Sequence, residues 1–466
     1  MQQQNHDDLV KRIARLMDEN KELSRQIKTL QDSFDKIQNE NDKLKLKVTR
    51  LQDKVAVESG ESEEDQILRF KMATVLFADI QGFENINTES NSHHIIDELD
   101  NMFFRFDEIS KKHNIARIKT IGDTYMSAGG IPIKNITNPI DVVLAALEMR
   151  HMLYTTQHDR SDENRQIWDL SIGMHTGPVI ATTMGKKKVS YNIKGETVNI
   201  ASRMQAACKT GNINISIMTY EMIREYFECE YVGRMPVKYE GDVEMYMVKG
   251  LKPEFAADDS KTIPNQKFIV KYLLRQFSDL QEIILDKLEK ELPSYLYYHN
   301  YKHTIDVVSQ TELIGIGEGV NDTEMLLLKT AALFHDTGHI VNSDNHEHLG
   351  TLLVREMLPN YNYNDEQIEE ICKLIMATKM PPNPQTLLEK IMCDADLDYL
   401  GRADFIPVSN TLFEELKAQN KITELNEWNK MQVKFISGHQ YFTDTANKLR
   451  EVNKQKQIDR IKSLIV

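Results

Sequence analysis

The sequence predicts a multidomain protein with three parts: an N-terminal α-helical coiled coil, an α+β domain and an all-α domain. Residues 1–57 contain neither Gly nor Pro and carry apolar residues in a heptad rhythm. Residues 67–251 alternate strand-like and helix-like segments, and residues 266–466 are helical in pattern almost throughout. A chain of 466 residues is long enough for two or three domains, so this division fits its length.

The N-terminal segment has the repeat of a two-stranded coiled coil. Asn20 and Asn41 stand at two a positions, where the rhythm requires an apolar residue, and a buried Asn at a fixes register and strand number. Because the heptads persist beyond the three or four that a coiled coil needs, we expect a parallel homodimer rather than a single surface helix. The repeat consists of Leu9, Ile13, Leu16, Leu23, Ile27, Leu30, Phe34, Ile37, Leu44, Val48, Leu51 and Val55.

The composition narrows the classes of partner. Acidic residues outnumber basic ones, 71 to 57, which argues against a nucleic-acid-binding surface but not against a nucleotide site. The four cysteines have no paired spacing, so we expect reduced thiols. No apolar run has the length needed to cross a bilayer, and the N-terminus lacks an apolar signal region. These features predict a cytoplasmic protein without a transmembrane segment.

The α+β part begins after a short joint at residues 58–66, which is acidic and carries the first Gly of the chain. Apolar alternation and helical spacing then predict a split βαβ, ferredoxin-like core with helices on one face. The expected strands are Met72–Ala78, Ile115–Ile121, Thr124–Ala128, Leu170–Thr176 and Val179–Thr183, and the expected helices are His94–His113, Pro139–Tyr154 and Val198–Ala207.

Two carboxylates mark the ends of expected strands. Thr74–Phe83 reads as an apolar strand that ends in Asp79 and a turn. Arg117–Gly130 reads as a β-hairpin with Asp123 at its turn. One such Asp alone more often caps a helix, but two on neighbouring strand ends can hold two Mg²⁺ ions that bridge a nucleotide's phosphates.

Together with Ser190–Gln205, these stretches resemble the class III adenylate/guanylate cyclase catalytic domain over about Phe70–Leu251. The resemblance implies that one protomer holds two Mg²⁺ or Mn²⁺ ions and that the turn after the first strand approaches the phosphates. The implied metal ligands are Asp79, Asp123 and the Ile80 carbonyl, and the implied phosphate contacts include Ile80, Gly82 and Phe83.

The same resemblance implies that the partner protomer completes the site. Asn199 would position the ribose, and Arg203 would neutralise charge that develops on the transferred phosphorus. Lys238 would meet the terminal phosphates. The implied reaction is attack of the ribose 3′-OH on the α-phosphate with loss of pyrophosphate.

The positions that contact the base in this family are Lys119 and Asn192. Lys119 can donate to adenine N1, and the Asn192 side-chain oxygen can accept from the adenine amino group. Guanine N1–H would face the Lys119 ammonium, donor against donor, which favours ATP. Adenine-specific members carry Asp where this chain has Asn192, and an amide can also turn to donate to guanine O6, so GTP is the alternative.

A Pro-containing linker at residues 252–265 precedes the helical domain, residues 266–466. Its expected helices are Phe268–Leu292, Thr304–Ile316, Asp322–Phe334, Asp365–Ala377, Thr386–Met392 and a long region from Val408. Three short runs rich in His and Asp interrupt this pattern: Tyr298–Thr304, Phe334–His339 and Cys393–Leu397. Histidines and carboxylates that converge from separate helices form a site for a divalent metal.

These runs resemble the HD phosphohydrolase superfamily, which includes the cyclic-nucleotide phosphodiesterases. The resemblance implies one or two divalent metals, with Fe, Mn, Mg and Zn all open. His299 would be the general acid for the leaving group, and a metal would activate the attacking water. The implied first-metal ligands are His303, His335, Asp336 and Asp396, with Asp394 as the alternative to Asp396, and a second metal would lie near Asp336, His339 and His346.

The sequence does not identify the substrate of the helical domain, because no Gln is an obvious purine contact and Gln440 is only a weak candidate. The chain could combine a cyclase with a hydrolase of its own product or of another phosphoester. It could instead combine a cyclase with a purely regulatory metal-binding domain. A coiled-coil scaffold with two inactive domains is the third hypothesis, and the intact site residues in both domains argue against it.

Overall fold

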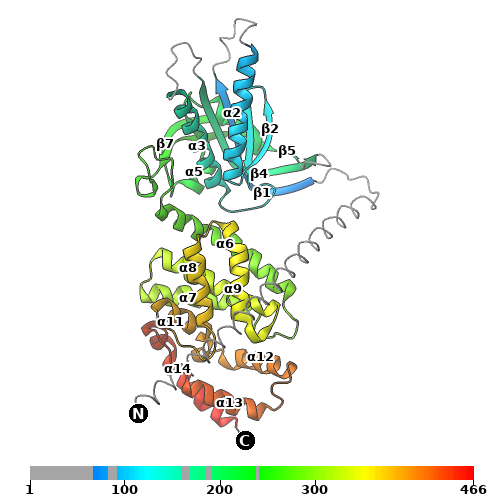
Figure 1. Ribbon diagram of the computed structural model, residues 1–466, viewed down its shortest axis with the longest axis vertical. Helices are drawn as coiled ribbons and strands as arrows, with labels where there is room; N and C mark the ends of the chain where they lie inside the picture. Colours follow the sequence, from blue (N-terminus) through cyan, green and yellow to red (C-terminus); the bar gives the residue numbers. More distant parts are fainter. Residues whose placement is uncertain (1–66, 82–91, 159–167, 185–189, 238–240, 466) are drawn as a thin grey trace, which may run out of the picture. The chain divides into compact units, whose positions relative to one another are not determined.

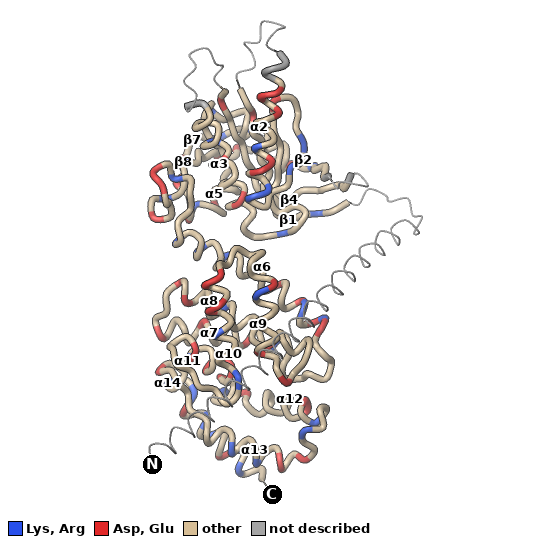
Figure 2. Tube along the Cα trace, in the orientation of Figure 1, with Lys and Arg blue, Asp and Glu red and all other residues tan. Residues whose placement is uncertain are grey.

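The computed structural model describes residues 67–81, 92–158, 168–184, 190–237 and 241–465. The predicted coiled coil and the joint at residues 58–66 lie outside these residues, as do Gly82, Phe83 and Lys238. The described chain forms a sheet domain followed in sequence by a helical domain (Figure 1). Basic and acidic residues are interspersed along both (Figure 2).

The sheet domain contains an eight-stranded mixed sheet with the strand order β2-β3-β1-β4-β6-β8-β7, and β5 pairs with β4 outside this path. Strands β4 and β6 run parallel, and the other pairs are antiparallel. The strands are β1 Ile67–Gln81, β2 Ala116–Ile121, β3 Thr124–Gly129, β4 Asp169–Met184, β5 Ser190–Lys194, β6 Ile213–Ser216, β7 Phe227–Val237 and β8 Gly241–Leu251.

Helices lie on both faces of the sheet. On β1, Leu76 and Ala78 pack in one apolar cluster with α2 (Ser92–Lys112) and α3 (Asn138–His158). Their neighbours Val75 and Phe77 point to the opposite face, where α4 (Glu196–Ala206) contributes to a second cluster. This alternation is the period-two pattern of a strand buried on both faces. The expectation of one covered face was therefore incomplete.

The sheet also differs from the expectation in its strands. The two strands expected on either side of Gly177 and Pro178 form one strand, β4. Pro178 cannot donate a ladder hydrogen bond, and the β1–β4 register shifts opposite it, between Phe70 and Ala73. Strands β5 to β8 and the short helix α5 (Ile217–Ile223) were not among the expected elements.

The segment between the domains is folded. Residues Pro253–Phe255 form the 3₁₀ helix η2, the Phe255 side chain is buried, and Ala256 pairs with Pro264 across the loop. From residue 266 onward the described chain contains helices and no strand, as predicted. None of the described helices combines the length and apolarity that crossing a bilayer requires.

The helical domain is built from nine α-helices and four 3₁₀ helices among the described residues. The α-helices are α6 Gln266–Glu291, α7 Tyr301–Glu318, α8 Asp322–Phe334, α9 His346–Met357, α10 Asp365–Ala377, α11 Leu387–Asp396, α12 Phe405–Ala418, α13 Leu425–Gly438 and α14 Asp444–Ser463. The 3₁₀ helices are η3 Thr337–Ile340, η4 Ser343–Asn345, η5 Leu358–Tyr361 and η6 Asp398–Gly401, after η2 in the connection.

Asp141, near the start of α3, is a buried carboxylate at the boundary with α6. It accepts hydrogen bonds from the Tyr272 hydroxyl at 2.8 Å and from the Thr137 hydroxyl at 3.1 Å. Burial raises the pKa of Asp141 to about 7, these two hydrogen bonds partly oppose the rise, and the nearby charge of Asp279 adds to it. The folded state therefore favours the protonated form of Asp141.

We expect Asp141 to make the protein less stable as the pH rises. Its pKa is higher in the folded state than in the unfolded chain, so its contribution is complete below about pH 4 and is lost as the pH rises through about 7. Relative to Asp141→Asn, the wild type should lose on the order of a few kcal/mol of unfolding free energy over this range. Denaturant unfolding at pH 5 to 8 measures how the unfolding free energy changes with pH. The exposed Glu108→Gln control should keep the wild-type slope.

Candidate functional site

The two strand-end carboxylates of the sheet domain lie side by side. Asp79 pairs in register with Thr124, whose hydroxyl donates to the Asp79 carboxylate at 2.8 Å. The Ile80 N–H donates to the Asp123 carbonyl at 3.2 Å. Gly122 turns the β2–β3 hairpin with φ of 62°, a left-handed conformation that favours glycine. Both carboxylates are half-buried, so two neighbouring, partly solvated anionic groups are available to divalent cations.

The residues predicted to act from a partner protomer lie on accessible surfaces. Asn199 and Arg203 are exposed one turn apart on α4, and Lys119 is exposed on β2. Arg203 donates to the Pro236 carbonyl at 3.2 Å and, in the part of the chain that is described, forms no ion pair with Asp79. Asn192 lies half-buried on β5, which contacts β2.

In the helical domain, capped helix starts set the position of each metal-site motif. A side-chain cap at an N-terminus satisfies backbone N–H groups and fixes where the helix begins. Helix α7 then presents His303 in its first turn, α8 ends directly before His335, and α11 ends at Asp396. The caps are Asn300 for α7, the Asn321–Glu324 capping box for α8 and the Thr386–Glu389 capping box for α11.

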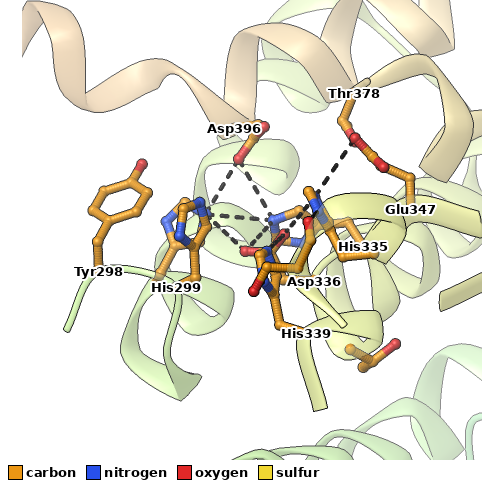
Figure 3. A network of polar contacts seen from close by, with 12 residues as sticks. Tyr298, His299, His335, Asp336, His339, Glu347, Thr378 and Asp396 are labelled. Carbon is orange, nitrogen blue, oxygen red and sulfur yellow. Dashed lines mark hydrogen bonds and ion pairs between the residues drawn. The ribbon is translucent and has the colours of Figure 1, made fainter. Parts of the chain in front are cut away.

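Four predicted ligands converge into one group, and Figure 3 labels three of them, His335, Asp336 and Asp396. The His303 Nε2 atom lies 3.2 Å from Asp396 Oδ1 and 3.4 Å from Asp336 Oδ2. The His335 Nε2 atom lies 3.5 Å and 3.3 Å from the same two oxygens. Ligands held about 2.1 Å from one ion at tetrahedral or octahedral angles are about 3.0–3.4 Å apart, so this set fits a single divalent metal.

Hydrogen bonds to backbone carbonyls orient two histidines of the cluster. Nδ1 of His335 donates to the Ala332 carbonyl at 2.8 Å, and Nδ1 of His346 donates to the Ser343 carbonyl at 2.9 Å. Because a carbonyl can only accept, these contacts place the lone pair of each ring on Nε2.

The carboxylates of the cluster stay charged. Burial alone would raise the pKa of Asp396, but hydrogen bonds to His303 and His335 lower it below its ordinary value. The carboxylate therefore remains ionised, which is the form that binds a metal.

Asp336 faces a second group of donors with its other oxygen. Asp336 Oδ1 lies 3.7 Å from His339 Nε2 and 3.6 Å from His346 Nε2. Burial lowers the pKa of His339 to about 3, so its ring is neutral and able to ligate. Asp336 Oδ2 and His339 Nε2 are buried without a hydrogen-bond partner, as expected for atoms that complete a metal's shell. These residues fit a second ion bridged to the first by Asp336.

Gly338 allows the two halves of this site to meet. A Cβ at this position would lie 1.9 Å from the His346 carbonyl oxygen, so η3 could not approach the start of α9 with any other residue. His339 and His346 consequently stack, with their ring centroids 4.0 Å apart.

Asp394, the alternative ligand, forms hydrogen bonds away from the metal cluster. It is buried, and its oxygens accept from the backbone N–H groups of Phe442 and Thr443 at 2.8–3.1 Å and from the Thr443 hydroxyl at 2.7 Å. Neither group of potential metal ligands found among the described residues contains Asp394. The carboxylate therefore anchors the start of α14, and the ligand position falls to Asp396.

We expect Asp394→Asn and Asp396→Asn to fail in different ways. Asp394→Asn should lower the unfolding free energy by about 1–3 kcal/mol, because a charged acceptor of buried donors is lost, and should leave metal content unchanged. Asp396→Asn should lose the first metal with little loss of stability. Thermal melts and metal analysis of both proteins measure this. Metal loss in Asp394→Asn alone would reverse the assignment.

His299 lies beside the cluster (Figure 3), and the buried Glu415 carboxylate holds its ring. Its Nδ1 lies 2.5 Å from Glu415, which also accepts from the backbone N–H groups of Tyr298 and His299. Burial would lower the pKa of His299, but the hydrogen bond to Glu415 and the charge of Asp336 raise it above its ordinary value. A protonated His299 beside a metal cluster can give its proton to a leaving oxygen.

We expect Glu415→Gln to lower the pKa of His299. If the protonated ring is the acid, the basic limb of the kcat profile for hydrolysis should then move to lower pH by about one unit. The matched variant Glu414→Gln changes an exposed neighbour on the same helix and should leave the profile in place. A Glu415→Gln profile identical to the wild type would remove Glu415 from this role.

A mainly apolar pocket of about 300 Å³ opens beside the cluster. Its wall includes His299 and Asp336 of the site and Trp428, Gln432 and Phe435 of α13. The Gln432 side chain is buried, and its amide oxygen accepts from the Ser409 hydroxyl, which leaves the amide N–H₂ group to face other partners.

Two residues of this site were missed in the sequence. Gln432, rather than the exposed Gln440, lines the pocket. A signal existed in the spacing of Gln432 and Phe435, which share one face of a helix, but it is weak. Glu415 had no local signal, because its contact with His299 joins positions more than a hundred residues apart.

The family model for the adenylate and guanylate cyclase catalytic domain matches residues 66–250, and the model for the HD domain matches residues 300–398. A receptor-type guanylate cyclase, gcy-10, of Caenorhabditis elegans is 34% identical over 182 residues, 38% of this chain and 17% of that protein. The human guanylate cyclase soluble subunit beta-2 is 33% identical over 180 residues, 38% of this chain and 29% of that protein. The match thus spans less than a third of these relatives.

Among solved structures, the guanylate cyclase domain of RhGC from Catenaria anguillulae in complex with GTP is 30% identical with a TM-score of 0.36, covering 40% of this chain and 100% of that one. The adenylyl cyclase CyaB from P. aeruginosa is 28% identical with a TM-score of 0.37, covering 40% and 98%. The chain therefore joins a class III nucleotide cyclase catalytic domain and an HD domain in one polypeptide.

Proposed function

We propose that the protein forms cyclic AMP and pyrophosphate from ATP at sites shared between two copies of the chain. The observation that carries the proposal is the side-by-side placement of Asp79 and Asp123 at two strand ends of the cyclase domain. These carboxylates would hold two Mg²⁺ or Mn²⁺ ions, which would lower the pKa of the ribose 3′-OH and stabilise the leaving pyrophosphate. The exposed Asn199 and Arg203 would reach this site from the partner.

The choice of ATP rests on Lys119 and Asn192. Guanine N1–H and the Lys119 ammonium are both hydrogen-bond donors, so binding of guanine would leave a donor unpaired. GTP is the second candidate, because the relatives reported above are named guanylate cyclases. Purified protein with Mg²⁺ or Mn²⁺ should therefore convert ATP faster than GTP when the two compete at equal concentration. A higher kcat/KM for GTP would show that GTP is the substrate, and the proposed cyclisation reaction would stand.

For the HD domain we propose hydrolysis of a cyclic nucleotide. His299 would protonate the leaving oxygen, and Glu415 would keep that ring charged and oriented. The base would lie in the pocket, with its edge at the Gln432 amide and its apolar face against Phe435. The bound metals would supply an activated water and neutralise the phosphate.

The alternative is a regulatory HD domain that binds a metal and a ligand without turnover. Incubation of the protein with cyclic AMP or cyclic GMP, followed by chromatography, separates the two proposals. Release of the 5′-nucleotide that depends on His335 supports hydrolysis. Binding of the cyclic nucleotide without product supports the regulatory role.

A further inference from the structure

Helix α6 is shared by the two domains. Near its start, Phe268 packs edge-to-face on Tyr226 of the cyclase domain, with ring centroids 5.4 Å apart. About two and a half turns beyond Phe268, the Phe277 ring lies 5.1 Å from the Lys329 ammonium of α8. The helix has 26 residues and is therefore about 39 Å long. A continuous helix of this length moves largely as one body, so a displacement at one end reaches the other.

On the cyclase side, α6 is joined to the first turn of α3 by polar contacts. The Tyr272 hydroxyl donates to Asp141 at 2.8 Å and lies 3.2 Å from the Thr137 hydroxyl. Two turns further along α6, Asp279 accepts from the Ile136 N–H at 2.9 Å. Asp141 is only 6% exposed, and a buried polar group that loses its partner carries a large cost. The first turn of α3 must therefore follow Tyr272.

The same turn of α3 is tied to the strand that carries Asp79. Asn138 accepts from the Thr74 hydroxyl of β1 at 2.7 Å, and Thr74 pairs with Thr176 of β4 at 2.9 Å. All three side chains are fully buried. Thr74 lies five residues before Asp79 on β1. A shift of the first turn of α3 would therefore bear on the strand whose end forms the proposed metal site.

On the other side, α6 packs against the elements that carry the HD cluster. It contacts α8, which ends directly before His335, and η3, which contains His339. Beside Asp141 and Tyr272 lies an open pocket of about 520 Å³, lined by residues of the cyclase domain, the connecting segment and the helical domain.

We infer that α6 couples the two sites, with Tyr272 as the positioning residue through which the HD cluster acts on β1 and Asp79. This rests on the proposed cyclase function, since Asp79 must belong to a nucleotide site. Coupling between binding sites is reciprocal and is typically 5- to 150-fold in affinity. Spatial continuity alone does not establish coupling, so the test has to measure an interaction between substitutions.

The experiment measures nucleotide binding, not turnover. A fluorescent 3′-deoxy derivative of ATP cannot cyclise, and its Kd with Mg²⁺ reports the cyclase site in the full-length protein. We expect His335→Ala, which disrupts the HD cluster, to change this Kd by at least about fivefold in the parent chain. In a Tyr272→Phe background, the same substitution should change it less than about twofold. Tyr297→Phe, which removes an exposed hydroxyl of the helical domain, is the matched control and should leave the full effect.

A second measurement follows the junction itself. Hydrogen exchange of the Ile136 amide, which donates to Asp279, should change when the nucleotide derivative binds, and the change should be lost in Tyr272→Phe. Asp141→Leu, which removes the acceptor of the Tyr272 hydroxyl, repeats the test with a different substitution and should behave as Tyr272→Phe does.

The possible outcomes distinguish failure of the coupling from failure of the proposed cyclase function. An intact chain that fails to bind the nucleotide derivative would overturn the cyclase proposal and the coupling together. Binding that ignores His335→Ala would overturn the coupling alone. An effect of His335→Ala that persists undiminished in both Tyr272→Phe and Asp141→Leu would exclude the contact between α6 and α3 as its route.

Discussion

Asp79→Ala and Arg203→Ala chains are expected to be inactive as homodimers and to regain activity when co-expressed. Asp79 belongs to the proposed metal side of a site and Arg203 to the side that the partner completes. Each homodimer therefore lacks one component in both sites, and loss of either should lower kcat by at least about 100-fold. A heterodimer keeps one site intact, because one chain supplies Asp79 and the other Arg203.

The expected recovery of activity follows from the number of intact sites among randomly paired dimers. Random pairing makes half of the dimers mixed, and each mixed dimer has one intact site of two, so the preparation should reach about a quarter of wild-type activity. Ser202→Ala, an exposed neighbour of Arg203 on α4, should stay near the wild-type level. If the mixture remains as inactive as its parents, both residues serve the same site of one chain and the shared-site proposal fails.

Asp336→Asn is expected to have the largest effect in the HD domain. One carboxylate faces both groups of donors, with Oδ2 toward His303 and His335 and Oδ1 toward His339 and His346. Replacing one oxygen by an amide nitrogen removes a charged ligand from at least one ion and leaves the histidines without their central counter-charge. Both metals should be lost, and hydrolysis should fall by at least about 1000-fold.

Metal content measured by mass spectrometry and 5′-nucleotide release should fall together, while the cyclase reaction continues. Asp344→Asn removes an exposed carboxylate a few residues away and should change neither. A full metal complement in Asp336→Asn would contradict the bridging role, whether or not the domain turns over substrate. The metal measurement therefore stays informative even if the HD domain is regulatory.

Much of the fold follows from local patterns. The helical pattern of the sequence marked α8 and α10 at the residues where the structure has them, and apolar alternation marked β3. Pattern reading failed where tertiary pairing decides. Gly177 and Pro178 look like a break between strands, but the bulge in β1 lets β4 continue past them. The coiled-coil repeat, read from residues 1–57, stays a prediction.

The sequence alone identified the potential ligands, because His, Asp and the Gly between them stand close together in short runs of the chain. It did not determine how these runs come together in space. Asp394 and Asp396 are two residues apart on α11, and helical geometry turns them to different sides; only the packing of α14 against Asp394 decides which one faces the histidines. Glu415 and Gln432 reach the HD site from α12 and α13, and Tyr272 reaches α3 from α6. Such contacts join residues that are distant in sequence, so neither periodicity nor motif spacing encodes them, and they become visible only when the chain is packed.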